Sequence, residues 1–205
     1  MMLKGLTAEY LVRRTYQVSP GDRILVHAAA GGVGQILCQW AAQIGAKVIG
    51  TVGSTAKREI AERLGCARVI VTEEEDFVAV TRAETGGEGV AVVYDGIGAD
   101  TFEGSLRCAR VRGLVVAFGA ASGPIPKLDV QSLAGLGSLY VTRPGIDAYT
   151  RTSEELREAA DALFTMVRSG CVRIAPPRTY PLAEAAQAHA DLEGRRTTGS
   201  VVLLP

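Results

Sequence analysis

Short apolar runs alternate with amphipathic stretches along most of this 205-residue chain. The apolar runs predict six strands, at residues 24–26, 46–52, 68–71, 90–94, 114–118 and 138–142. The stretches between them predict helices at 35–44 and 54–64, a third that begins at residue 73, and a fourth that follows the strand at 90–94 and ends at residue 108. Strands that are apolar throughout are typical of a parallel sheet whose two faces are both covered by helices. The pattern therefore predicts an α/β fold with a doubly wound parallel sheet of about six strands.

The two ends of the chain do not continue this alternation. Residues 3–18 have helical spacing, with Leu6, Tyr10, Leu11 and Val12 on the expected apolar face and Lys4, Glu9, Arg13 and Arg14 on the expected solvent face. After Gly145 the pattern predicts a long helix at 153–169, a short strand near Val172, a helix at 182–192 and a strand at 199–204. We therefore predict a sheet domain at 20–145 with flanking elements at 1–19 and 146–205.

The turn after the first strand consists mainly of residues with little or no side chain. Ala28, Ala29 and Ala30 precede Gly31-Gly32-Val33-Gly34 and the next predicted helix. Small residues let backbone N–H groups approach an anion, and the helix start adds the positive end of its dipole. One interpretation is the diphosphate-binding turn of a Rossmann fold; the other is a tight turn that only permits close helix–strand packing. The usual G-x-G-x-x-G pattern is absent, because Ala29 stands in the place of its first glycine.

The end of the second strand bears on the choice of cofactor. NAD-binding folds place a carboxylate there, about twenty residues past the glycine turn, to bind the ribose hydroxyls. Here the strand ends at Thr51-Val52-Gly53-Ser54 without an acidic residue, so nothing in this stretch repels a 2′-phosphate. Lys57 follows closely, and although a lysine on a helix is usually only a solvated side chain, its charge at this place favours NADPH.

Composition excludes several other classes. The chain is 47% hydrophobic and 21% charged with a formal net charge of zero, which disfavours binding to nucleic acid or to an anionic membrane surface. It has no apolar run of membrane-spanning length and no signal-peptide core. Its four widely spaced cysteines predict buried free thiols in a cytoplasmic protein, without a metal site. His27 is interpreted as a packing residue, and Glu73–Glu75 as an exposed first helical turn.

Five motifs in order along the chain resemble the zinc-independent quinone oxidoreductases of the medium-chain dehydrogenase/reductase superfamily. They are Ala28–Gly34, Gly50–Gly53, Val93–Asp95, Gly137–Pro144 and Tyr180–Leu182. Members of that family begin with a barrel-like catalytic domain that has no counterpart here. The resemblance therefore implies a fragment, in which residues 1–19 and 146–205 would complete the missing domain. It also implies that this chain alone binds cofactor and has little or no turnover.

The resemblance implies a cofactor site for NADPH. Lys57, Arg143 and Arg195 match cofactor-contacting residues of the family, whereas Thr72 stands where relatives often have a tyrosine near the 2′-phosphate. The strand ends supply the other contacts, at the diphosphate and near the nicotinamide. The whole predicted set is Ala30, Gly31, Gly32, Val33, Gly53, Lys57, Thr72, Phe118, Gly119, Tyr140, Arg143 and Arg195. Gly96 and Ala120 replace a serine and an asparagine of the family, and no catalytic residue is assigned.

The implied activity is hydride transfer from NADPH to a quinone or a similar enone. Two alternatives stay open: a non-catalytic dinucleotide-binding module, and a reductase of enoyl thioesters or alkenals. Residues 138–142 would form an apolar sheet edge, which predicts a homodimer that pairs two such edges.

Overall fold

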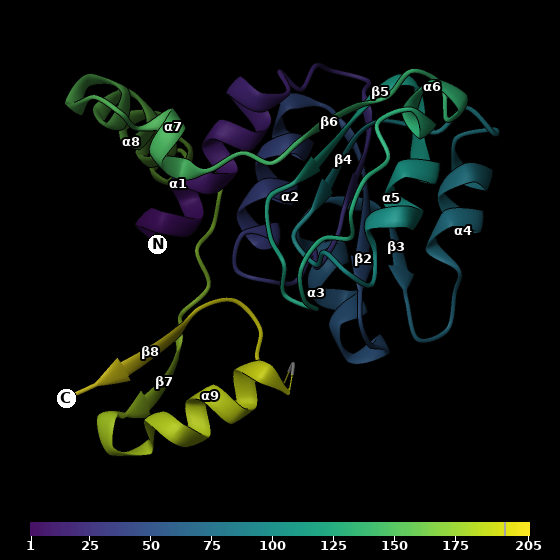
Figure 1. The fold of residues 1–205 in the computed structure, drawn as a ribbon. Coiled ribbons are helices and arrows are strands. Elements are labelled where there is room, and N and C mark those ends of the chain that lie inside the picture. Colours follow the sequence, from purple (N-terminus) through teal and green to yellow (C-terminus); the bar gives the residue numbers. More distant parts are fainter. Residues whose placement is uncertain (195) are drawn as a thin grey trace.

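The chain folds around a six-stranded parallel sheet (Figure 1). This computed structural model describes residues 1–194 and 196–205. The strand order is β3-β2-β1-β4-β5-β6, and every neighbouring pair runs parallel. The strands are β1 (Arg23–Val26), β2 (Lys47–Val52), β3 (Cys66–Val71), β4 (Val90–Asp95), β5 (Ala109–Ala117) and β6 (Tyr140–Thr142). The predicted doubly wound sheet is confirmed.

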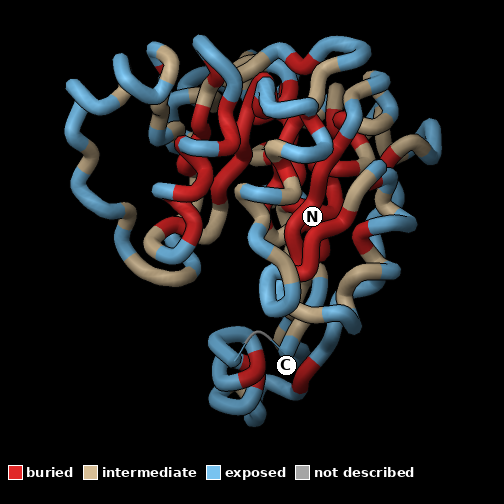
Figure 2. Tube along the Cα trace, turned by 90° about the vertical axis from the view of Figure 1, so that its right-hand side faces the viewer, coloured by how far each residue is buried: buried red, intermediate tan, exposed pale blue. Residues whose placement is uncertain are grey.

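Helices cover both faces of this sheet, and two apolar layers hold them there. Neighbouring residues of β1 illustrate the arrangement, because Leu25 belongs to one layer and Val26 to the other. One layer includes side chains of α2 (Gly34–Ile44), α3 (Arg58–Arg63) and α8 (Ser153–Arg168). The other includes side chains of α4 (Phe77–Glu84), α5 (Phe102–Cys108) and α6 (Ser132–Gly135). Figure 2 shows the buried residues gathered in the interior of the main body, which explains the apolar runs of the strands.

The N-terminal helix is joined to the sheet by a hydrogen bond at a local distortion. α1 (Met2–Tyr10) continues into a π-helical turn, η1 (Leu11–Thr15). The carbonyl oxygen of Leu11 accepts a hydrogen bond of 3.0 Å from the hydroxyl group of Tyr94 on β4. Because both residues are buried, this bond satisfies two polar groups that have lost contact with water.

The prediction that Glu9 lies on the solvent face of this helix is wrong. Its side chain is only 1% exposed, and its carboxylate pairs with Arg14 at 2.6 Å and with Arg13 at 3.1 Å. A buried carboxylate requires such partners. Helical spacing alone did not reveal that α8 also packs on α1, where a Cβ atom at Gly5 would lie 2.4 Å from Cδ2 of Leu163.

The acidic run Glu73–Glu75 does not begin a helix, contrary to expectation. α4 begins only at Phe77, because Asp76 accepts hydrogen bonds from two N–H groups of its first turn. The acidic run forms a turn after β3, in which Glu75 pairs with Arg68. The hydrogen bond from the backbone N–H of Val71 and, after it, the contact with Arg68 hold the pKa of Glu75 below its usual value.

Other boundaries differ from the predicted ones. Ser54 supplies no side-chain cap, and the helical segment begins as a 3₁₀ turn, η2 (Thr55–Lys57), before α3. No strand forms at Val172, which is instead buried in a core layer. The next strand, β7 (Arg178–Pro181), starts only after the proline pair. A short helix, α7 (Ile146–Tyr149), was not predicted.

The C-terminal elements form a small unit beside the main sheet (Figure 1). β7 pairs in parallel with β8 (Val201–Leu204), and the connection between them contains η3 (Leu182–Glu184) and α9 (Ala185–Glu193). Most of this unit is exposed (Figure 2). Among the described helices of the whole chain, none combines the length and apolarity of a transmembrane span.

Candidate dinucleotide-binding site

The turn between β1 and α2 lies where the strand order reverses. β2 lies on one side of β1 and β4 on the other, and ligands of open parallel sheets bind at such a point. The N–H of Gly31 closes the turn by donating to the carbonyl oxygen of Ala28 at 2.8 Å. The N–H groups of Gly32 and Val33 donate to no described residue. Unpaired N–H groups at the start of an eleven-residue helix suit an anion.

Within this turn, position 34 is the one that must be glycine. A Cβ atom at Gly34 would lie 2.3 Å from the carbonyl oxygen of Ala28 and 2.8 Å from that of Ala29. Ala29 itself is fully buried and its φ lies outside the left-handed region, which is occupied by Ala28 instead (φ 52°). The alanine in place of the first glycine is therefore compatible with a formed turn.

A chain of buried hydrogen bonds connects this turn to the end of β4. His27 Nδ1 lies 3.0 Å from Thr51 Oγ1, and His27 Nε2 lies 3.1 Å from Ser105 Oγ. Because Ser105 donates its proton to Asp95 Oδ2 at 2.7 Å, it accepts one from Nε2–H. Thr51 then donates to Nδ1 and accepts a hydrogen bond of 3.3 Å from the N–H of Ala28. The chain thus ends on the residue with the left-handed backbone.

The order of donors in this chain requires a neutral imidazole. Complete burial lowers the pKa of His27 from 6.5 to about 4, and the carboxylate of Asp95 opposes this shift more weakly. The imidazole is therefore uncharged near neutral pH, and His27 acts as a packing and bridging residue. Asp95 also accepts hydrogen bonds from the N–H groups of Ile97 and Gly98, so it shapes the loop after β4.

The residues predicted to bind the ribose phosphate lie together at the ends of β2 and β3. Gly53 follows β2 directly, and a Cβ atom there would meet open space. Lys57 ends the η2 turn that follows. Thr72 follows β3, where its N–H donates to the carbonyl oxygen of Val52 at 2.9 Å. Because β2 and β3 are adjacent and parallel, all three residues lie at the carboxyl ends of these strands.

A carboxylate also reaches this place, contrary to expectation. Glu74, from the turn after β3, is hydrogen-bonded to the hydroxyl group of Thr55. Its Oε2 lies 3.7 Å from Arg58 Nη2, so the charge is partly compensated. This acid does not follow β2, where NAD-binding folds place their carboxylate, but comes from the turn after the neighbouring strand β3.

The loops after β4 and β5 contact each other at backbone distance. A Cβ atom at Gly119 would lie 2.3 Å from the carbonyl oxygen of Gly96, and one at Gly96 would lie 2.8 Å from the ring of Phe118. The Phe118 N–H donates to the carbonyl oxygen of Asp95 at 2.8 Å. The aromatic ring therefore lies where a serine at position 96 would place its side chain.

Arg143 and Tyr140 lie at opposite ends of β6. Arg143 follows the strand, and its Nη1 donates to the carbonyl oxygen of Ala117 at 2.8 Å, at the carboxyl end of β5. Tyr140 begins the strand, opposite Leu114, and is 63% exposed. Of these two residues, only Arg143 lies at the carboxyl ends of the strands, where the other predicted residues lie. Arg195 lies outside the described residues.

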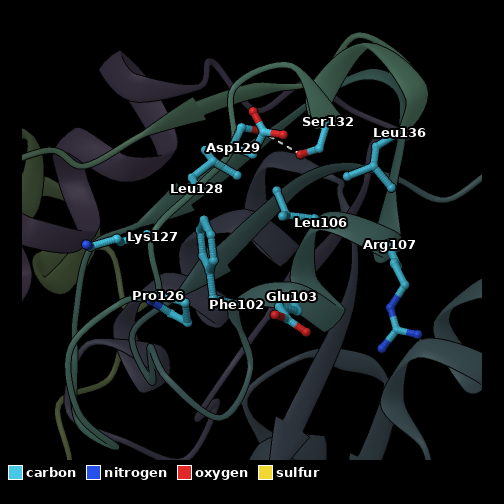
Figure 3. Close-up of a pocket in the computed structure, with 10 residues that line it drawn as sticks. All are labelled: Phe102, Glu103, Leu106, Arg107, Pro126, Lys127, Leu128, Asp129, Ser132 and Leu136. Carbon is cyan, nitrogen blue, oxygen red and sulfur yellow. Dashed lines mark hydrogen bonds between the residues drawn. The ribbon is translucent and has the colours of Figure 1, made fainter.

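Two hollows adjoin the loop after β5. The first measures about 610 Å³, and its lining combines apolar side chains with Arg143: Phe102, Ala117, Ala120, Pro124, Ile125, Leu128, Val141 and Thr142. The second, of about 420 Å³, lies between α5 and the segment 126–136 (Figure 3). Of the described residues predicted to bind cofactor, only Arg143 lines either hollow. Apart from Arg143, the described residues predicted to bind the dinucleotide therefore lie outside both hollows.

A parallel sheet with a glycine-rich turn at its reversal point defines a dinucleotide-binding fold of the Rossmann type. Within that class, residues 32–165 match the zinc-binding dehydrogenase family, and the chain belongs to this family. The family's description names zinc, yet no group of three His, Cys, Asp or Glu side chains in residues 1–194 and 196–205 is arranged to hold a metal ion.

The predicted resemblance to quinone oxidoreductases is confirmed. The chain is 49% identical to quinone oxidoreductase 1 of Escherichia coli over 205 residues, which are 99% of this chain and 63% of that protein. It is 48% identical to a 2-haloacrylate reductase of a Burkholderia species, over all of this chain and 62% of the relative. The crystal structure of Escherichia coli quinone oxidoreductase complexed with NADPH superposes with a TM-score of 0.95, at 48% identity, over 99% of this chain and 63% of that one. The chain thus spans less than two thirds of these relatives.

Proposed function

We propose that this chain is the NADPH-binding part of an oxidoreductase that transfers hydride to a quinone or a similar enone. The observation that carries the proposal is the turn at residues 28–34, where the N–H groups of Gly32 and Val33 are available to a diphosphate. When bound, NADPH supplies the hydride. The chain binds and orients the dinucleotide through the loops at the ends of β1, β2, β5 and β6, and no zinc takes part.

The proposed residues divide by the part of NADPH that they contact. Ala30 to Val33 bind the diphosphate, while Gly53, Lys57 and Thr72 surround the 2′-phosphate. Phe118, Gly119 and Arg143 lie toward the nicotinamide, together with the backbone that follows Tyr140. Arg195 completes the set by the family resemblance. Residues 20–145 are the dinucleotide-binding domain in this proposal, and the protein is cytoplasmic.

The proposed acceptor is an electron-poor double bond conjugated to a carbonyl group. A quinone and a 2-haloacrylate, named in the relatives, share this feature. NADPH-dependent reduction of such an acceptor by the whole protein would favour this proposal over a non-catalytic binding module. Comparing a quinone, an alkenal and an enoyl thioester as acceptors would separate the two reductase alternatives.

We expect Lys57→Ala to weaken NADPH binding by roughly tenfold or more, because a charge-assisted contact to a phosphate contributes about 1.5–3 kcal/mol. NADH lacks the 2′-phosphate, so its dissociation constant should change little. Fluorescence or calorimetric titration of this chain with both dinucleotides measures the effect. The matched control is Lys47→Ala, which removes an exposed lysine from the opposite end of β2. Equal losses for NADPH and NADH would argue against a role in phosphate recognition.

We also propose that two copies pair through the edge strand at residues 138–142. β6 is the last strand of the sheet, and Tyr140 is 63% exposed. Leu139 is buried in a core layer, so a charge there would damage the fold and could not test pairing. We expect Tyr140→Lys to give monomers, because two lysines would then face each other across the edge. Light scattering during gel filtration measures the mass, and a monomeric parent chain would contradict the proposal.

A further inference from the structure

A lysine side chain from the first helix lies against the glycine turn. α1 packs beside α2, and Lys4 extends from the first turn of α1 toward Gly32. A Cβ atom at Gly32 would lie 2.5 Å from both Cδ and Nζ of Lys4. The space that a side chain at position 32 would need is therefore occupied by the end of this lysine. Sequence periodicity placed Lys4 on the solvent face, but the structure half-buries it.

The ammonium group of Lys4 contacts only neutral oxygen atoms of the described chain. Its Nζ donates to the carbonyl oxygen of Gly199 at 3.2 Å and to Ser200 Oγ at 3.1 Å. No carboxylate in residues 1–194 or 196–205 forms an ion pair with it. Partial burial lowers the pKa of Lys4, since the charged form has lost part of its hydration. A nearby anion would favour the charged form.

Gly199 and Ser200, which we term the C-terminal strap, lie along the same turn. Gly199 forms a parallel bridge with Gly31, and its N–H donates to the carbonyl oxygen of Ala30 at 3.4 Å. Gln35 extends from α2 toward Gly199 and also donates to the carbonyl oxygen of Ala30. The strap and α1 thus hold the ammonium group beside the N–H groups of the turn.

We propose that Lys4 is a further cofactor-binding residue, which donates to the diphosphate of the dinucleotide. The assignment rests on the proposed function of this turn as the diphosphate site. A diphosphate carries two negative charges, and the unpaired N–H groups of Gly32 and Val33 supply only partial positive charge. The Nζ atom of Lys4 adds a full charge at the same turn and has a third proton to donate. The lysine thereby serves NADPH and NADH alike, in contrast to Lys57.

The competing explanation is that Lys4 only ties α1 to the strap. Variants and probes separate the two roles. Lys4→Met removes the charge and keeps most of the length, Lys4→Arg keeps the charge, and Ser200→Ala removes one acceptor of the tie. The probes are NADPH, NADH and adenosine 2′-monophosphate, which carries the 2′-phosphate without a diphosphate.

We expect Lys4→Met to raise the dissociation constants of NADPH and NADH equally, by roughly tenfold, as for the loss of a charge-assisted hydrogen bond. Binding of adenosine 2′-monophosphate should be unchanged. Lys4→Arg should retain affinity to within about threefold, because the guanidinium is also a cationic donor. Ser200→Ala should retain affinity as well, and thermal melting of each variant reports any loss of fold.

Unchanged NADPH and NADH binding by a folded Lys4→Met chain would overturn the assignment. Equal weakening of adenosine 2′-monophosphate, or an equal loss in Ser200→Ala, would overturn it too, because either result indicates a structural tie. Failure of the parent chain to bind NADPH or NADH would instead overturn the proposed function, and the assignment with it.

Discussion

We expect Gly34→Ala to abolish dinucleotide binding at concentrations that saturate the parent chain. The added methyl group would lie 2.3 Å from the carbonyl oxygen of Ala28 and 2.8 Å from that of Ala29, and both atoms belong to the backbone. The turn must therefore shift as a unit. Because the N–H of Gly31 donates to the carbonyl oxygen of Ala28, the shift also displaces the donors expected to face the diphosphate. At a preorganised site, a displacement of about 1 Å can lower activity by on the order of a hundredfold, and we expect a large loss of affinity here for the same reason.

The measurement is a titration of Gly34→Ala with NADPH and NADH, alongside thermal melting. Gly135→Ala is the matched control, since a Cβ atom at Gly135 in α6 would meet open space and its φ is not left-handed. We expect the control to bind as the parent does and to be at least as stable, because alanine favours helix over glycine. Tight binding by Gly34→Ala would show that the turn accommodates a methyl group at this position, and would contradict the requirement for glycine.

The sheet could be predicted from the sequence because its determinants are local. Each strand contains a short apolar run, and within that of β1 the neighbouring Leu25 and Val26 pack into opposite layers. The glycine turn was equally readable, since the need for Gly34 arises from atoms five and six residues earlier in the chain. Such short-range constraints leave a sequence pattern.

The parts that could not be predicted depend on which segments meet in space. Glu9 has a solvent-face spacing, yet its carboxylate is buried beside two arginines of its own helical segment. Glu74 reaches the loop after β2 from the turn after β3. Lys4 has the periodicity of an exposed lysine, but the packing of α1 beside α2 brings it to Gly32, where Gly199 and Ser200 accept its hydrogen bonds. For Glu74 and Lys4 the environment comes from a distant segment, so neither periodicity nor spacing reports it.

Acid should destabilise this fold through His27 well before most carboxylates are protonated. In the unfolded chain this imidazole has the ordinary pKa of about 6.5, whereas burial in the fold lowers the pKa to about 4. Between these values the unfolded state binds more protons than the folded state. The free energy of unfolding therefore falls as the pH decreases from about 6.5 to about 4, by roughly 3 kcal/mol in all. Below about pH 4 both states are protonated at His27 and this contribution stays constant.

The hydrogen-bond chain explains why the fold cannot easily accommodate the protonated form. A proton on Nδ1 would face the hydroxyl group of Thr51, which now donates to that nitrogen and accepts from the N–H of Ala28. Thr51 would have to turn its hydroxyl proton away from Nδ1 and accept hydrogen bonds from both the imidazolium and the N–H of Ala28. Protonation thus requires the hydrogen bonds around Thr51 to rearrange.

Urea unfolding at a series of pH values tests this account. His27→Asn should be less stable at pH 7, because the buried bonds to Thr51 and Ser105 are lost or lengthened, but its stability should change little between pH 6.5 and 5. The parent chain should approach a slope of one proton, about 1.4 kcal/mol per pH unit, in that interval. His189→Asn, at the only other histidine, is the matched control, since His189 is exposed on α9, and it should keep the slope of the parent. The same slope in the parent chain and His27→Asn would mean that other groups govern the acid response. If His27→Asn alone flattens the curve, protonation of the buried imidazole causes the loss of stability in this pH range.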